Sequence, residues 1–181
     1  MLIPGIDDRV TFSVLSALVM FALGRLAERF KAKDQERHSA KAVALPLLTI
    51  AEALEKHCRM LDEALSRNGE SLRAYYKFVA ELVPQVDLDE FGAQVGGSAR
   101  LPHNALADLR SAHQSTARAS SRHDQLRQTL EMSTPGAPEG EAYRRLLFSA
   151  RDAVRNGLRR LEDLGPTDTR RAIANFMRES Q

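Results

Sequence analysis

Residues 10–24, VTFSVLSALVMFALG, constrain this chain more than any other stretch because they contain no charged side chain. Eleven of these 15 residues are strongly apolar, and charges close both ends, with Asp8 and Arg9 before the stretch and Arg25 after it. As a helix the stretch would be about 22 Å long, against a bilayer hydrocarbon core of about 30 Å. The leading interpretation is a short membrane-spanning anchor, with candidate spanning side chains Val10, Phe12, Leu15, Leu18, Phe21 and Leu23.

Two other interpretations of residues 10–24 compete with the anchor. A secretory signal begins with a basic segment, whereas this chain begins MLIPGIDDR, with two acids beside one arginine. The signal interpretation is therefore disfavoured. A buried helix of a soluble protein is favoured by the marginal length of the stretch, which would then pack inside a helical bundle or in a dimer interface.

The basic residues around the stretch predict its orientation. One arginine precedes it, while six basic residues follow closely: Arg25, Arg29, Lys31, Lys33, Arg37 and Lys41. The positive-inside rule then places the C-terminal body in the cytoplasm of a single-pass membrane protein. The segment that carries these residues is predicted to be a charged helical stalk exposed to solvent, and binding of anionic lipid headgroups is the functional alternative.

Length and composition limit what can follow the anchor. A chain of 181 residues accommodates one ordinary domain besides an anchor, and 43% hydrophobic with 28% charged residues is typical of a folded body. A net charge of only +2 gives no general electrostatic footprint for nucleic acid, which is therefore an unlikely partner. The single cysteine, Cys58, excludes an internal disulfide and a multi-cysteine zinc site.

The first half of the body is predicted to hold two helices and a long connection. Pro46 suits the first turn of a new helix, which ends at Asn68 and Gly69 and has apolar positions at spacings of four and three: Leu47, Ala51, Leu54, Cys58, Leu61 and Leu65. Ser71 is the predicted cap of a second helix that ends at Pro84. Periodicity fails over 85–104, so we expect a connection there with at most one short turn of helix.

The second half is predicted to hold two long helices and a short one. Asn104 caps a helix that reaches about Met132, with the stripe Ala105, Leu109, Ala112, Thr116, Ala119, His123, Leu126 and Leu130. The linker STPGAPEG, 133–140, separates it from a helix with the stripe Tyr143, Leu147, Ala150, Val154, Leu158, Leu161 and Leu164. Gly165 and Pro166 end that helix, and Thr167 or Asp168 caps a last one with Ile173, Phe176 and Met177 on one side.

These elements predict an all-α fold. It consists of the N-terminal apolar helix, spanning or buried, followed by an antiparallel bundle of four to five helices. The expected organisation is an N-terminal segment at 1–24, a stalk at 25–44, the bundle at 45–165 and a short C-terminal helix at 166–181.

The common patterns of metal, cofactor and catalytic chemistry are not met. None of the five histidines follows an acid by three residues, and no His-x-x-x-His pair occurs. The segment 87–98 begins like a calcium loop, but Phe91 stands at a ligand position and Ser98 at the twelfth place. Ser120 and His123 share a helical face in an ordinary spacing. We therefore predict no metal, no cofactor and no catalysis, and an inert core thiol at Cys58.

The middle of the helix predicted to begin after Asn104 is unusual, because residues 112–125 include no large apolar residue. This part either packs closely through alanine against bulky neighbours or is partly exposed to a partner. The candidate partner face comprises Ala112, Thr116, Ala119, His123, Arg118 and Arg122. Further arginines, six of them between 144 and 160, form either a solvated face or a contact surface for an acidic partner.

Two function classes follow. The leading one is a membrane-anchored cytoplasmic helical bundle that acts without catalysis, by contacting a protein partner or by self-association, as a scaffold, regulator or assembly component. The alternative is a soluble helical binding module in which residues 10–24 are buried in the bundle or in a dimer interface. An enzyme with a site assembled from the acidic loop and the arginine faces is a third and weaker hypothesis.

Overall fold

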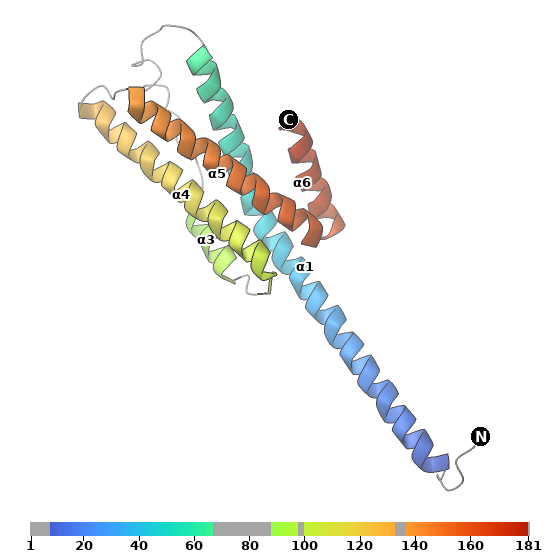
Figure 1. The fold of residues 1–181 in the computed structure, drawn as a ribbon. Coiled ribbons are helices and arrows are strands. Elements are labelled where there is room, and N and C mark those ends of the chain that lie inside the picture. Colours follow the sequence, from blue (N-terminus) through green and yellow to red (C-terminus); the bar gives the residue numbers. More distant parts are fainter. Residues whose placement is uncertain (1–7, 67–87, 98–99, 133–136, 181) are drawn as a thin grey trace. The chain divides into compact units, whose positions relative to one another are not determined.

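The structure, a computed structural model, describes residues 8–66, 88–97, 100–132 and 137–180. In these ranges every element of regular secondary structure is a helix, which confirms the all-α prediction. The helices are α1 (Asp8–Ser66), α3 (Leu88–Gly97), α4 (His103–Met132), α5 (Ala137–Leu164) and α6 (Thr167–Glu179) (Figure 1). The predicted helix that begins at Ser71 lies outside the described residues.

The chain divides into two units, residues 1–36 and 37–181. The first unit holds the N-terminal part of α1, whose side chains are described from Leu18 onward. Its large apolar side chains are exposed: Leu18 by 62%, Phe21 by 63% and Leu23 by 55%. Within the described residues, no helix has an apolar run of the length that a bilayer crossing requires. The predicted span has no support there, and Val10, Phe12 and Leu15 lie outside the described side chains.

The core of the second unit begins on α1 at Ala40, inside the segment 25–44 that was assigned to a stalk. The predicted seam from Leu47 to Leu61 is buried along its whole described length. The prediction that Pro46 begins a new helix is wrong, because Pro46 lies inside α1. Val43 and Ala44 before the proline are buried, as is Leu47 after it, and their packing offsets the loss of one helical hydrogen bond.

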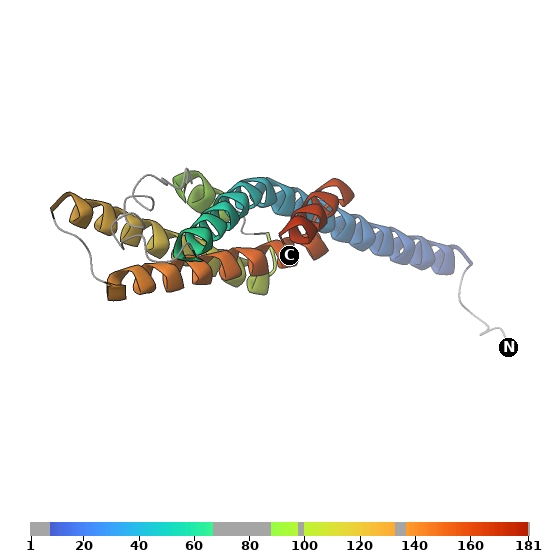
Figure 2. The ribbon, with the colours of Figure 1, turned by 90° about the horizontal axis from the view of Figure 1, so that it is seen from above.

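Helices α4 and α5 lie side by side, and the second-unit part of α1 packs on them (Figures 1 and 2). A Cβ atom placed on Gly157 of α5 would stand 3.2 Å from Leu47 Cδ2 of α1 and 3.5 Å from Leu109 Cδ2 of α4. The three helices therefore approach closely at Gly157, where α5 has no side chain. Both predicted stripes are buried, from Ala105 to Leu126 on α4 and from Tyr143 to Leu161 on α5.

The connections differ from the predictions in two places. Residues 85–104 were expected to be a connection with at most one short turn, yet α3 occupies ten of them. Its Phe91 and Val95 are buried one turn apart, and the Phe91 ring lies 5.8 Å from that of His113 on α4. Three glycines in ten residues give α3 a weak helix propensity, so these tertiary contacts hold it. The predicted linker 133–140 is shorter than expected, because α5 begins at Ala137.

The C-terminal turn and α6 follow the prediction except at the cap. Gly165 donates its N–H to the carbonyl of Leu161 at 2.8 Å, which ends α5. The N-cap of α6 is Pro166, without a side-chain hydrogen bond, and not Thr167 or Asp168 as expected. Asp168 lies in the first turn and binds Lys41 of α1 at 2.6 Å. Ile173 and Phe176 are buried, and Met177 packs against them.

Candidate functional site

In the structure, four residues of the predicted partner face of α4 are buried and the other two are accessible. Ala112, Thr116, Ala119 and His123 are all less than 5% exposed. Arg118 is exposed and Arg122 is half-buried. The middle of α4 therefore packs closely through its small residues, the first of the two arrangements expected for it. A partner could meet the two arginines directly, whereas the four buried side chains already contact the rest of the bundle.

Three buried polar side chains, each from a different helix, form a cluster at the centre of the bundle: His57 of α1, His123 of α4 and Tyr143 of α5. Tyr143 Oη and His57 Nε2 are hydrogen-bonded at 2.7 Å. The His57 ring lies 6.0 Å from the ring of His123 and 5.9 Å from that of Tyr143. Sequence reasoning placed His123 and Tyr143 in apolar stripes but did not bring the three together. The sequence did hold one indication that His57 is buried, since it is next to Cys58 of the predicted apolar seam of α1.

The electrostatics of the cluster keep His57 neutral. Burial, the larger cause, and the neighbouring His123 together lower the pKa of His57 to about 4, because both disfavour an imidazolium. All three side chains are less than 5% exposed. In the part of the chain that the structure describes, no three His, Cys, Asp or Glu side chains are grouped to hold a metal ion. The burial of the three side chains and the hydrogen bond between Tyr143 and His57 make the cluster a polar element of the core.

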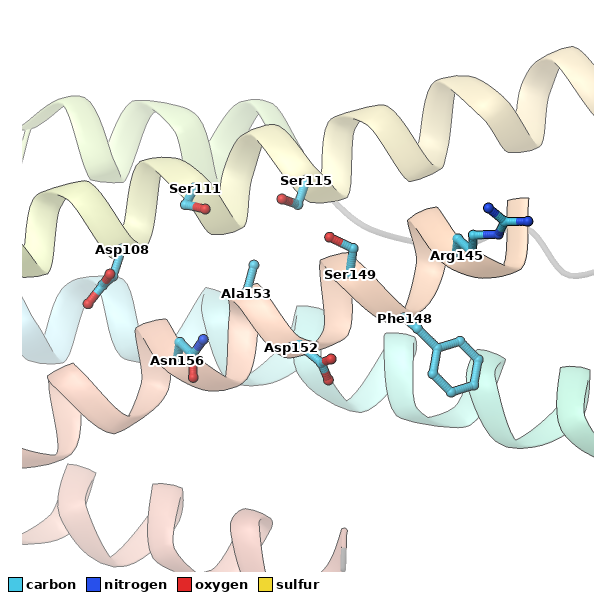
Figure 3. Close-up of a pocket in the computed structure, with 9 residues that line it drawn as sticks. All are labelled: Asp108, Ser111, Ser115, Arg145, Phe148, Ser149, Asp152, Ala153 and Asn156. Atoms are coloured by element: carbon cyan, nitrogen blue, oxygen red, sulfur yellow. The ribbon is translucent and has the colours of Figure 1, made fainter. Parts of the chain in front are cut away.

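An open polar groove of about 570 Å³ runs between α4 and α5. Asp108 and Arg145 lie at opposite ends, and the hydroxyl groups of Ser111, Ser115 and Ser149 lie between them (Figure 3). Phe148, Asp152, Ala153 and Asn156 complete the lining. Small residues on both helices leave the groove shallow, so it suits an elongated segment lying on the surface better than an enclosed small molecule.

The groove differs in charge from end to end. At one end Asp108 is paired with Arg160 at 2.8 Å. Asp152, midway along the α5 side, is paired with Arg151 at 3.0 Å (Figure 3). At the other end, Arg145 makes no ion pair within the described residues. Positions 108, 111, 115, 118 and 122 follow spacings of three and four, so Arg118 and Arg122 continue the α4 side of the groove. Two residues of the predicted partner face thus extend its basic end.

A second cleft, of about 470 Å³, lies where α1, α5 and the end of α6 meet. Glu55 and Arg155 form an ion pair at 2.6 Å with side chains only 14% and 22% exposed. Arg155 also donates from Nη2 to the carbonyl of Ser180 at 2.6 Å, which ties the end of α6 to α5. Cys58 lines this cleft, and burial raises the pKa of its thiol to about 12. A thiol held in its neutral form is a poor nucleophile.

The chain matches no protein-family model, and neither the curated proteins nor the solved structures provide a relative. The case for a function therefore rests on the residues of this chain.

Proposed function

We propose that this protein is a membrane-anchored helical bundle that contacts a protein partner and carries out no catalysis. Residues 10–24 are the anchor, and the body from residue 37 onward is an antiparallel bundle in the cytoplasm. The bundle acts as a scaffold, a regulator or a component of a larger assembly.

The main support for the membrane anchor is the distribution of exposed apolar side chains on α1. Leu18, Val19, Met20 and Phe21 are exposed by 62%, 51%, 70% and 63%. Successive helical residues are rotated by about 100°, so these four positions surround the helix. A helix that is apolar on all sides suits a medium that covers all sides, whereas one partner helix covers a single stripe. A lipid bilayer meets this requirement.

The length of residues 10–24 and the basic residues that follow them determine how the anchor would lie in the bilayer. The proposed anchor uses residues 10–17 in addition to residues 18–24, whose side chains the structure describes. At about 22 Å it is shorter than the average hydrocarbon core, so the proposal includes local thinning of the bilayer. The six basic residues that follow place the C-terminal side in the cytoplasm by the positive-inside rule.

The anchor is tested by introducing charge into it. In a double variant, Val19→Arg with Leu23→Arg, two charges lie within the apolar run, and we expect the full chain to leave the membrane fraction. The matched control is Leu45→Arg with Met132→Arg, since these side chains are 72% and 85% exposed in the other unit. The control should float with membranes in a density gradient. If the first variant floats as well as the control, the anchor proposal is wrong.

The soluble binding module is the second candidate, and the same exposed residues favour it. An apolar helix left open by one chain can be covered by a second copy. This candidate predicts that the full chain is a stable oligomer in buffer without detergent. Analytical ultracentrifugation distinguishes the two, since an anchored protein aggregates or needs detergent under these conditions.

The antiparallel order of α4 and α5 is supported by two pairs of residues. Asp108 near the start of α4 binds Arg160 near the end of α5, and His123 late in α4 lies 6.0 Å, ring to ring, from Tyr143 early in α5. This order lines the groove with both helices along its length. We assign the partner contact to this groove, and its basic end favours a partner segment that carries carboxylates.

Crosslinking inside cells tests the contact surface. A photoreactive amino acid at Ser115 or Ser149 should crosslink to one protein of defined mass, and Arg118→Glu with Arg145→Glu should abolish that adduct. The control position is Lys56, exposed on α1. The same adduct from Lys56, or an adduct that survives both glutamates, would remove the groove from the proposal.

A further inference from the structure

The first unit carries a row of three cations on one side of α1. Arg25, Arg29 and Lys33 follow one another at intervals of four residues, and all three are exposed. Each step of four residues turns the helix by only about 40°, so the three side chains form a continuous ridge about 12 Å long. We call Arg25, Arg29 and Lys33 the basic ridge.

Two exposed apolar side chains lie beside the basic ridge. Leu26 is 48% exposed and Phe30 is 71% exposed. By helical geometry they lie within about 60° of Lys33, on the side away from Glu28. The ridge and these two residues therefore present positive charge and apolar surface side by side, directly after the proposed anchor.

The charges of the ridge are available to a ligand. Within the described residues neither Arg29 nor Lys33 forms an ion pair. Arg25 contacts the ring of Phe21, with the guanidinium carbon 5.4 Å from the ring centroid, and this contact leaves its charge uncompensated. Lys41, the last of the six basic residues, is bound by Asp168.

We propose that the basic ridge, with Leu26 and Phe30, binds anionic phospholipids at the membrane surface. The guanidinium and ammonium groups meet the headgroup phosphates, and Leu26 and Phe30 lie among the upper parts of the acyl chains. This inference rests on the proposed anchor, since the anchor brings the ridge to the surface, and it adds the class of lipid that is recognised. Helix rise places Lys33 about 12 Å beyond Arg25, close to the distance over which salt screens a surface charge.

The apolar neighbours favour lipid over nucleic acid. A nucleic-acid backbone offers phosphates, but no apolar phase to receive exposed Leu26 and Phe30 side chains. A lipid surface offers both at the same depth, where aromatic side chains are commonly found. A surface made of cations alone would not distinguish these ligands.

Native mass spectrometry of the detergent-solubilised full chain tests the proposal. The chain is mixed with equal amounts of phosphatidylglycerol and phosphatidylcholine, and bound lipids of each kind are counted. The test variant combines Arg25→Gln, Arg29→Gln and Lys33→Gln. The control combines Lys56→Gln, Arg127→Gln and Arg171→Gln, which removes three exposed cations from the second unit.

We expect the unmodified chain and the control to retain phosphatidylglycerol in excess. The test variant should lower the ratio of phosphatidylglycerol to phosphatidylcholine by about fivefold or more, the effect of at least one cation near an anionic surface. An unchanged ratio in the test variant, or an equal fall in the control, overturns the lipid assignment while the anchor stands. A full chain that is soluble without detergent and retains neither lipid overturns the anchor and the ridge together. Binding of a short DNA duplex that depends on the ridge, with no lipid preference, also overturns it.

Discussion

The hydroxyl oxygen of Tyr143 lies 2.7 Å from Nε2 of His57, which joins α5 to α1 in the centre of the core. Tyr143 is 1% exposed and His57 is 4% exposed. A buried polar pair of this kind favours one arrangement of two helices, because a shift along their axes would break this hydrogen bond inside the core. The pair therefore contributes to the register of the bundle as well as to its stability.

Replacing Tyr143 with phenylalanine tests this pair. The variant Tyr143→Phe keeps the ring and removes the hydroxyl group, so that His57 loses this partner inside the core. We expect the free energy of unfolding to fall by about 1–3 kcal/mol. Urea unfolding followed by circular dichroism gives the value. Ser149→Ala, which removes an exposed hydroxyl group, is the control and should change the stability by less than about 0.5 kcal/mol.

The stability of the bundle should depend on pH through His57. Folding lowers the pKa of His57 from 6.5 to about 4. The unfolded chain therefore takes up the proton first, and the folded state should lose stability as the pH falls from about 6.5 towards 4. The loss should approach about 3 kcal/mol and level off below pH 4, where the folded state is protonated too.

His57→Gln separates this effect from the titration of other groups. Glutamine cannot take up a proton, so the variant should lose much of the dependence between pH 6.5 and 4, whatever its stability at neutral pH. The same slope in both proteins would show that other groups cause the dependence.

Sequence periodicity predicts the core helices well because each buries one stripe. Spacings of three and four residues identify the buried positions of α1, α4 and α5, and Gly165 ends α5 as expected. The prediction at Pro46 was wrong because it considered only the local effect of proline on a helix. It did not include the tertiary packing of Val43 and Leu47, which are buried on either side. The three glycines of α3 misled it likewise, since the Phe91 contact with His113 is tertiary.

The candidate sites were harder to predict because they are assembled across helices. His57, His123 and Tyr143 come from three elements, and no spacing within one helix brings them together. The small residues of α4 indicated close packing, but whether that packing is inside the chain or against a partner depends on the place of α5. The exposure of Leu18 and Phe30 likewise depends on what the rest of the chain covers.

The thiol of Cys58 should resist alkylation while the protein is folded. Cys58 is 2% exposed, and burial raises its pKa to about 12, so little thiolate forms at pH 8. We expect iodoacetamide to react far more slowly with the folded chain than with the chain in denaturing urea. Intact mass measured over time gives both rates. Equal rates would show that Cys58 is accessible and that this part of the core opens readily.

The ion pair between Glu55 and Arg155 should stabilise the bundle more than an exposed pair. Arg155→Met leaves Glu55 as an uncompensated charge that is 14% exposed, and it releases the carbonyl of Ser180. We expect a loss of about 2 kcal/mol in the free energy of unfolding. Arg160→Met, which breaks the more exposed pair with Asp108, should cost less than about 1 kcal/mol. Equal losses would contradict this ranking.

Carbonate extraction of membranes tests whether residues 10–24 anchor the chain in a bilayer. The full chain and a chain that begins at Leu26 are expressed separately, and each membrane fraction is washed at high pH. We expect the full chain to stay in the membrane pellet and the shorter chain to be found in the supernatant. A full chain that is extracted into the supernatant, together with a shorter chain that aggregates, would show that residues 10–24 are covered by protein and would contradict the anchor.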